Sequence, residues 1–172
     1  MNNKIISLEK LSKKVQKAKE SKKRVIHCHG VFDLLHIGHI KHFEEAKSHG
    51  DFLVVTITPD QYVNKGPNRP AFSTKLRLEA LAALESVDFV AENEWSSAVK
   101  TIKRIKPDIY FKGPDYKNNS DDITGMIKEE SKAVESIGGK VKYSTDISFS
   151  SSSILNRYSD LYSDEQKAFI SS

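Results

Sequence analysis

Short apolar runs alternate with segments of helical periodicity along most of this chain, and that alternation limits its possible folds more than any other feature. The run Phe52–Ile57 is continuous and rich in β-branched residues, as expected of a strand buried on both faces. Before it, residues 38–48 repeat apolar side chains at helical spacing, and an earlier apolar run spans Val25–Cys28. Strands separated by helices predict a parallel sheet with right-handed crossover connections.

Further elements follow from the same periodicities. Three more short strands are expected, at residues 87–90, 109–111 and 141–143. Helices are expected from Ser73 or Thr74 onward and over residues 95–105, 123–136 and 150–158, with polar loops at 59–72 and 112–122. The expected fold class is therefore α/β, a single Rossmann-like domain whose five-stranded parallel sheet is flanked by helices.

The composition supports a folded domain and indicates the cellular compartment in which the chain is expected. With 172 residues, 38% hydrophobic and 29% charged, the chain is long enough to bury a core and too apolar for a disordered segment. No apolar stretch reaches the length of a membrane span, and the polar, lysine-rich start does not resemble a signal peptide. The single cysteine, Cys28, excludes an internal disulfide and fits a reducing compartment. We therefore expect a cytoplasmic protein without a membrane partner.

Lysines crowd the N-terminal segment and contribute to a formal net charge of +4. Leu8, Leu11, Val15 and Ala18 recur there at helical spacing, which predicts a helix with an apolar stripe against the domain and its lysines in solvent. No aromatic residue interleaves these lysines, so support for base stacking is missing. Nucleic acid is therefore not an expected partner.

The most specific chemistry lies in residues 30–39, Gly-Val-Phe-Asp-Leu-Leu-His-Ile-Gly-His, directly after the first expected strand. His36 and His39 flank Gly38 at the point where the strand gives way to a helix. Unpaired amides and the positive end of the helix dipole favour anions there, and a glycine lets the backbone approach a ligand closely. Imidazoles can donate hydrogen bonds to phosphate oxygens as negative charge builds on them. The segment therefore predicts a polyphosphate site.

Three polar segments follow expected strands and are candidates for the same site. Lys65 lies in the loop 59–72, Lys112 and Gly113 open the loop after the fourth strand, and a serine cluster occupies residues 150–152. In open parallel sheets, ligands bind beyond the carboxyl ends of the strands. We therefore expect these segments to meet the histidine pair in a single site.

Taken together, residues 30–39, Lys65, Arg77, the loop 112–117 and the serines 150–152 resemble the cytidylyltransferase-like nucleotidyltransferase superfamily. Within it, the chain is most similar to bacterial D-glycero-β-D-manno-heptose 1-phosphate adenylyltransferase domains and to glycerol-3-phosphate cytidylyltransferases. The opening segment Ser7–Leu11 is similar to the heptose branch. The resemblance implies an enzyme that binds a nucleoside triphosphate with Mg²⁺. A phosphate oxygen of the second substrate then attacks the α-phosphorus, and pyrophosphate leaves without a covalent enzyme intermediate.

The resemblance also implies roles for particular residues. The expected catalytic residues are His36, His39, Lys65 and Arg77. Asp115 is a candidate for contacting the ribose or ordering Mg²⁺, or else it forms an ordinary Asx turn. No direct protein ligand to the metal is predicted, because the triphosphate would supply most of the ligands of Mg²⁺. The expected nucleotide-binding residues are Gly30, Val31, Phe32, Asp33, Gly38, Lys112, Gly113, Asp115, Ser150, Ser151 and Ser152.

Other interpretations of the same residues are weaker. The sequence His-Ile-Gly-His is also a signature of class I aminoacyl-tRNA synthetases, but their second, lysine-rich loop and their tRNA-binding domain have no counterpart here. Zinc would need a further ligand beside His36, His39 and His42, and the serine cluster lacks a nucleophile-elbow pattern. His27 and His29 share one face of the first strand, either as buried histidines with satisfied hydrogen bonds or as ligand contacts.

The leading hypothesis is transfer of a nucleoside monophosphate from ATP or CTP to a phosphorylated sugar or polyol, of the heptose-1-phosphate adenylyltransferase type used in lipopolysaccharide precursor synthesis. Two alternatives stay open: cytidylyl transfer to glycerol 3-phosphate or a related alcohol, and a nucleotide-binding regulator without turnover. We expect a basic helix over residues 1–23, a nucleotidyltransferase domain over 24–158 and a tail over 159–172. A homodimer is among the expected assemblies.

Overall fold

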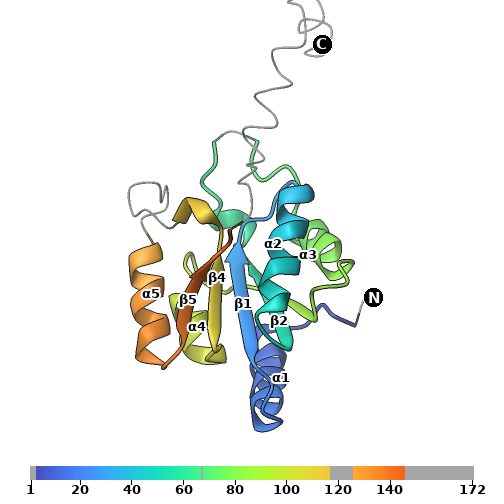
Figure 1. Cartoon of the computed structure of the whole chain (residues 1–172). Helices are drawn as coiled ribbons and strands as arrows, with labels where there is room; N and C mark the ends of the chain where they lie inside the picture. The colour runs from blue at the N-terminus through green and yellow to red at the C-terminus, as the bar shows by residue number, and fades with distance from the viewer. Residues whose placement is uncertain (1–2, 67, 117–125, 146–172) are drawn as a thin grey trace, which may run out of the picture.

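The computed structural model describes residues 3–66, 68–116 and 126–145, except for the side chain of Asp115. Five parallel strands form one sheet in the order β3-β2-β1-β4-β5, so the first strand lies at the centre (Figure 1). In register, Cys28 of β1 lies opposite Val55 of β2 and Phe111 of β4. The strands are β1 (Val25–Gly30), β2 (Phe52–Ile57), β3 (Phe89–Glu92), β4 (Ile109–Lys112) and β5 (Lys140–Tyr143).

Helices cover both faces of the sheet (Figure 1). They are α1 (Leu8–Glu20), α2 (Ile37–Ser48), α3 (Thr74–Ala82), α4 (Val99–Ile105) and α5 (Ile127–Ser136), with short 3₁₀ turns η1 (Asp60–Tyr62) and η2 (Pro114–Tyr116). The predicted α/β class, with a five-stranded parallel sheet flanked by helices, is confirmed.

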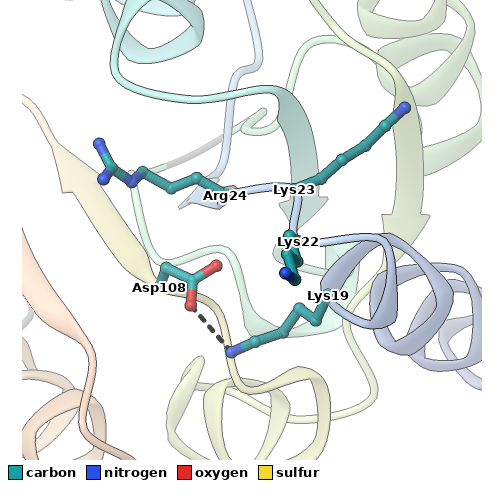
Figure 2. Close-up of a pocket in the computed structure, with 5 residues that line it drawn as sticks. All are labelled: Lys19, Lys22, Lys23, Arg24 and Asp108. Atoms are coloured by element: carbon teal, nitrogen blue, oxygen red, sulfur yellow. Dashed lines mark ion pairs between the residues drawn. The ribbon is translucent and has the colours of Figure 1, made fainter.

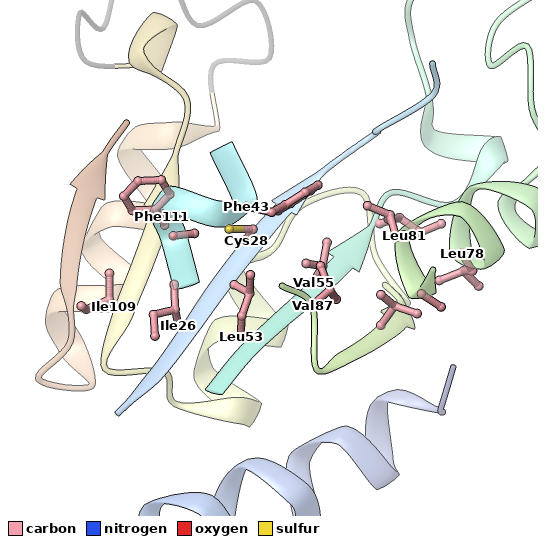
Figure 3. Packing of buried hydrophobic residues seen from close by; sticks show 14 residues of the cluster. Ile26, Cys28, Phe43, Leu53, Val55, Leu78, Leu81, Val87, Ile109 and Phe111 are labelled. Carbon is pink, nitrogen blue, oxygen red and sulfur yellow. The ribbon is translucent and has the colours of Figure 1, made fainter. Parts of the chain in front are cut away.

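Side-chain alternation along the strands divides the buried apolar residues between the two faces of the sheet. Ile26 and Cys28 of β1 pack toward α2 and α3, where Phe43 and Leu81 close over the sheet (Figure 3). On the opposite face, Val25 packs against the apolar stripe of α1. Because the central strands are covered on both sides, nearly all of their residues are buried, including the polar His27, His29 and Thr56.

The N-terminal segment belongs to the second face of the sheet. All four residues of the expected apolar stripe on α1 are buried, and Ser7 caps the helix by accepting a hydrogen bond from the Lys10 amide at 3.3 Å. Before the helix, Ile5 forms a parallel bridge to Val90, which extends the pairing at the β3 edge. The division of the chain at residues 23 and 158 stays a prediction.

Some element boundaries differ from those expected. The helix expected over residues 95–105 begins only at Val99. The reason is Asn93, whose side-chain amide donates to the carbonyl oxygens of Trp95 and Ser97 and so holds this segment in a turn. The helix expected over residues 150–158 lies outside the described residues.

Candidate active site

A tight turn at the carboxyl end of β1 builds the first part of the site. Gly30 ends the strand, and Phe32 takes a left-handed backbone conformation with φ of 48°. The Phe32 ring folds back over Gly30, where a Cβ atom would lie only 3.0 Å from the ring. Its centroid lies 5.5 Å from that of His39 and 5.0 Å from that of Phe43. A larger residue at position 30 would therefore push against the Phe32 ring, which supports the turn.

The histidine pair lies at the start of α2. His36 caps the helix, because its Nδ1 accepts a hydrogen bond from the Gly38 amide at 3.2 Å. The centroids of the His36 and His39 rings are 4.0 Å apart. Two buried ring nitrogens, His36 Nε2 and His39 Nδ1, have no hydrogen-bond partner among the described residues. Buried polar atoms are rarely left in this state unless a ligand or water completes them.

The charge states of the pair follow from their surroundings. Burial, with smaller effects from neighbouring positive groups including Lys65, lowers the pKa of His39 to about 3. Burial also lowers the pKa of His36. With Nδ1 of a neutral His36 accepting from an amide, the ring proton lies on Nε2, so the unpartnered atom is a hydrogen-bond donor. An anion bound next to the two rings would raise the pKa of His39, and the protonated ring could then donate a hydrogen bond too.

Asp33 connects this turn to the loop before α3. Its carboxylate accepts hydrogen bonds from the amides of Ala71 and Phe72, both at 2.9 Å, and from Arg69 Nε at 2.7 Å. Burial opposes ionisation, but these hydrogen bonds and the Arg69 charge outweigh it and lower the pKa of Asp33. Asp33 thus fixes the turn after β1 against the loop before α3, while its contact with nucleotide stays a prediction.

Lys65 reaches the same neighbourhood from the other side of that loop. Partial desolvation and the Arg69 charge lower the pKa of Lys65, and the Asp33 carboxylate acts in the opposite direction. The residue as a whole nevertheless remains exposed. The charge of Lys65 also contributes to lowering the pKa of His39, so the lysine acts electrostatically on that ring, and its contact with phosphate stays a prediction.

Arg77, the fourth expected catalytic residue, lies inside the protein. Its guanidinium donates to the carbonyl oxygens of Val31 at 2.6 Å, Phe72 at 3.0 Å and Thr58 at 2.9 Å. It also pairs with Asp60 at 2.6 Å. These bonds join the turn after β1, the end of β2 and the start of α3. The geometry favours a positioning role, and the expected catalytic role of Arg77 stays a prediction.

The loop after β4 begins with a buried lysine. The Lys112 ammonium lies 3.5 Å from a Glu130 carboxylate oxygen and 4.0 Å from the centroid of the Tyr116 ring. The chain then continues through Gly113 into η2. These contacts hold the loop against α5, and nucleotide binding by Lys112 and Gly113 stays a prediction. The Asp115 side chain and Ser150, Ser151 and Ser152 lie outside the described residues.

Beneath the turn, two histidines of β1 and two threonines near the end of β2 form a buried hydrogen-bonded cluster that the sequence did not predict. The Thr56 hydroxyl lies 2.8 Å from His27 Nε2 and 2.9 Å from His29 Nδ1, and Thr58 lies 3.3 Å from His29 Nε2. Burial lowers the pKa of His29 to about 3. The only sequence signal is polar residues at alternate positions of β1 and β2, which places them on one face of neighbouring strands.

A basic hollow of about 280 Å³ lies at the opposite end of the strands, lined by Lys19, Lys22, Lys23, Arg24 and Asp108. Figure 2 shows Lys23 and Arg24 extending in different directions, while Lys19 pairs with Asp108 at 3.0 Å. The cations do not converge on a common point, and this hollow contains none of the expected site residues.

Neither a metal cage nor a membrane span is found in the part of the chain that the structure describes. Residues 3–66, 68–116 and 126–145 contain no cluster of three or more histidine, cysteine, aspartate or glutamate side chains suited to a metal ion. Among the described helices, none has the length and apolar character needed to cross a bilayer.

Comparison with known proteins identifies the class to which this fold and site belong. The family model described as cytidylyltransferase-like matches residues 27–158. The chain therefore belongs to the cytidylyltransferase-like family, and it is a nucleotidyltransferase.

Particular relatives narrow the comparison. The chain is 42% identical over 139 residues to the bifunctional protein HldE of Sulfurimonas denitrificans and 38% identical over 142 residues to that of Aliarcobacter butzleri. These matches cover 79% and 81% of this chain but only 29% of each relative. The chain thus corresponds to less than a third of the bifunctional proteins it matches.

Solved structures agree with the fold. A lipopolysaccharide core biosynthesis protein from Thermoplasma volcanium is 30% identical, with a TM-score of 0.57, and the match covers 70% of this chain and 93% of that one. The pantoate-β-alanine ligase of Francisella tularensis has the same TM-score at 15% identity, over 81% of this chain and 66% of the ligase, and supports the fold alone.

Proposed function

We propose that this chain transfers the adenylyl group of ATP to a sugar 1-phosphate, with a heptose 1-phosphate as the acceptor, and releases pyrophosphate. One observation carries the proposal. Two adjacent imidazoles at the start of α2 each keep a buried ring nitrogen without a partner among the described residues, and the charge of Lys65 acts on one of them. This arrangement suits a ligand with several anionic oxygens.

The residues at the turn account for such a reaction without a protein nucleophile. An acceptor phosphate oxygen forms a bond to the α-phosphorus of ATP as the bond from that phosphorus to the bridging oxygen of pyrophosphate breaks. The amides at the start of α2 and the Nε2 donor of His36 would bind the phosphate oxygens, on which charge accumulates. Lys65 would neutralise the leaving pyrophosphate. Catalysis of this kind consists of positioning and charge stabilisation.

Magnesium would enter as part of the substrate MgATP. The carboxylate nearest the turn, Asp33, is already engaged by two amides and Arg69, and no set of three suitable ligands occurs among the described residues. A triphosphate-bound ion fits a site whose side chains are mostly cationic or neutral donors. Bound in this way, Mg²⁺ would supply charge neutralisation between the phosphates.

The acceptor class is supported by the relatives and by the sequence resemblance. The bifunctional HldE proteins match most of this chain, and the similar Thermoplasma volcanium structure is described as a lipopolysaccharide core biosynthesis protein. Both agree with the resemblance of the chain to heptose-1-phosphate adenylyltransferase domains. A sugar phosphate destined for a surface polysaccharide is therefore the proposed acceptor.

The deciding experiment is a matrix of ATP, CTP, GTP and UTP against heptose 1-phosphate, other sugar 1-phosphates and glycerol 3-phosphate, followed by pyrophosphate release and by mass spectrometry of the product. ATP with heptose 1-phosphate should give the highest kcat/KM. Faster turnover of CTP with glycerol 3-phosphate would replace the proposal by cytidylyl transfer. Saturable ATP binding without turnover on any acceptor would identify a nucleotide-binding regulator instead.

A further inference from the structure

We propose that Arg69, held in place by Asp33, is an additional binding residue for the triphosphate, and that it selects ligands by their number of phosphates. The inference rests on the proposed function, because it assigns a new contact in the same site. The expected catalytic residues His36, His39, Lys65 and Arg77 do not include Arg69.

The first observation is the way in which Arg69 is held. Its Nε donates to a carboxylate oxygen of Asp33 at 2.7 Å, and the two side chains are only 14% and 1% exposed. The same carboxylate accepts the amides of Ala71 and Phe72. Asp33 therefore fixes both the Arg69 side chain and the backbone that follows it.

The second observation is a donor that this arrangement does not use. Arg69 Nη2 is buried and has no hydrogen-bond partner among the described residues. An arginine whose purpose is an internal ion pair usually presents two N–H groups to the two carboxylate oxygens. Here the Asp33 oxygen atoms are shared with two backbone amides, and Nη2 is left for a further acceptor. Burying an arginine N–H without an acceptor is unfavourable, so an anionic oxygen is the expected partner.

The third observation is the balance of charge. Arg69 and Lys65 lie close enough that the charge of the first lowers the pKa of the second, and Lys65 in turn affects His39. Asp33 is the carboxylate that acts on Lys65 in the opposite direction. Two cations with one carboxylate leave a net positive charge between the loop before α3 and the histidine pair. A ligand with several negative charges is favoured there over one with a single phosphate.

The test compares ligands that differ in phosphate number. Binding of ATP, AMP and inorganic tripolyphosphate to the whole chain is measured by calorimetry for the wild type and for Arg69→Met. We expect Arg69→Met to weaken the binding of ATP and of tripolyphosphate by roughly tenfold or more, the usual effect of losing a hydrogen bond to a charged group. The binding of AMP should change by less than about twofold, because AMP does not extend to this loop. Arg69→Lys should restore only part of the loss, since an ammonium cannot donate to Asp33 and to phosphate in the same planar geometry.

Arg104→Met is the matched control, because Arg104 is an exposed arginine paired with Glu94 only at 3.4 Å. It should bind all three ligands as the wild type does. Equal weakening of AMP and ATP by Arg69→Met would show that Arg69 only supports the loop and would overturn the inference. Unchanged ATP binding in Arg69→Met would overturn it too, while leaving the proposed function intact. A wild type that binds neither ATP nor tripolyphosphate would instead contradict the proposed function itself. If Arg69→Met does not fold, the rise of Tm with tripolyphosphate decides the question, because it should be smaller in Arg69→Lys than in the wild type.

Discussion

Single residues in the turn after β1 divide their polar atoms between holding the turn and meeting a ligand. His36 uses Nδ1 to cap α2 and keeps Nε2 for another partner. Asp33 uses both carboxylate oxygens within the protein. A substitution at His39 should therefore affect chemistry more than stability, whereas one at His36, Asp33 or Arg77 should affect both.

The first prediction concerns His39. Replacing it with asparagine keeps a polar side chain in the turn but removes the imidazole, so kcat should fall by roughly a hundredfold, as for the loss of one transition-state donor. Pyrophosphate release measures this, and circular dichroism with thermal melting checks the fold. His49→Asn at the other end of α2 is the control. Wild-type turnover in His39→Asn would remove this residue from the mechanism.

The second prediction concerns Arg77. Methionine at this position would leave the carbonyl oxygens of Val31, Thr58 and Phe72 without the guanidinium donor and would remove the ion pair with Asp60. Denaturant titration should show a loss of about 3 kcal/mol in the free energy of unfolding. The KM for ATP should rise as well, because the same guanidinium connects the turn to the loop that carries Lys65. A variant of normal stability with reduced kcat alone would mean that Arg77 acts directly on the substrate.

Some features of the candidate site could be predicted from the sequence, and others could not. The position of the histidine pair at the start of a helix was predictable because a strand-to-helix junction has a local physical reason, whereas Gly30 and Asp33 were expected only from the family resemblance. The surroundings of Arg77 were not predictable, since its acceptors come from three segments that only the folded chain brings together. The unused donor of Arg69 could not be foreseen either, because it depends on how a distant carboxylate shares its oxygens.

At the scale of elements, continuous apolar strands were predicted well and helix starts less well. The observed bounds of β2 are those expected, because every residue of that strand faces a covered side of the sheet. The third strand begins two residues later than expected, at Phe89. Asp88, just before it, accepts a hydrogen bond from the Leu53 amide and pairs with Lys47. Its side chain therefore takes a β2 amide that would otherwise bond to the backbone of the third strand.

The third prediction tests the attachment of α1. Leu11 is fully buried between this helix and the sheet, so Leu11→Ala should reduce the free energy of unfolding by about 3 kcal/mol through the cavity it leaves. Gln16→Ala, on the exposed side of the same helix, should stay within about 0.5 kcal/mol of the wild type. Denaturant titration of both variants measures the difference. Equal stability of the two variants would mean that α1 contributes little to the fold.

Across the whole molecule, imidazoles that are buried or half-buried should control stability in weak acid. Burial lowers the pKa of His39 and of His29 to about 3 and that of His42 to about 4, from an ordinary value of 6.5. Between pH 6.5 and 4 the unfolded chain therefore binds protons that the folded chain does not, and stability falls as the pH falls. Each such histidine lowers the free energy of unfolding by up to about 1.4 kcal/mol for each pH unit in this range.

The fourth prediction follows from that balance. The free energy of unfolding, measured by denaturant titration at successive pH values, should decrease from pH 6.5 to pH 4. His42→Phe keeps an aromatic ring beside Phe111 but removes one titrating group. The pH dependence of the free energy of unfolding should therefore correspond to about one proton fewer taken up on unfolding. Lowered pKa values at Asp33 and Asp60 add their own loss only at lower pH, near 3.8 and below. A stability that stays constant down to pH 4 would contradict the burial of these rings.

The strand order has a consequence for how the chain is made. β1 is the central strand, yet its neighbour β4 begins at residue 109, more than 80 positions after β1 begins at residue 25. While the ribosome is still extending the chain, one edge of β1 stays unpaired, and every neighbouring pair of strands waits for a helix to be synthesised first. Such non-local pairing slows folding and exposes apolar edges to other nascent chains, so translation speed and chaperone supply should govern the yield of this protein.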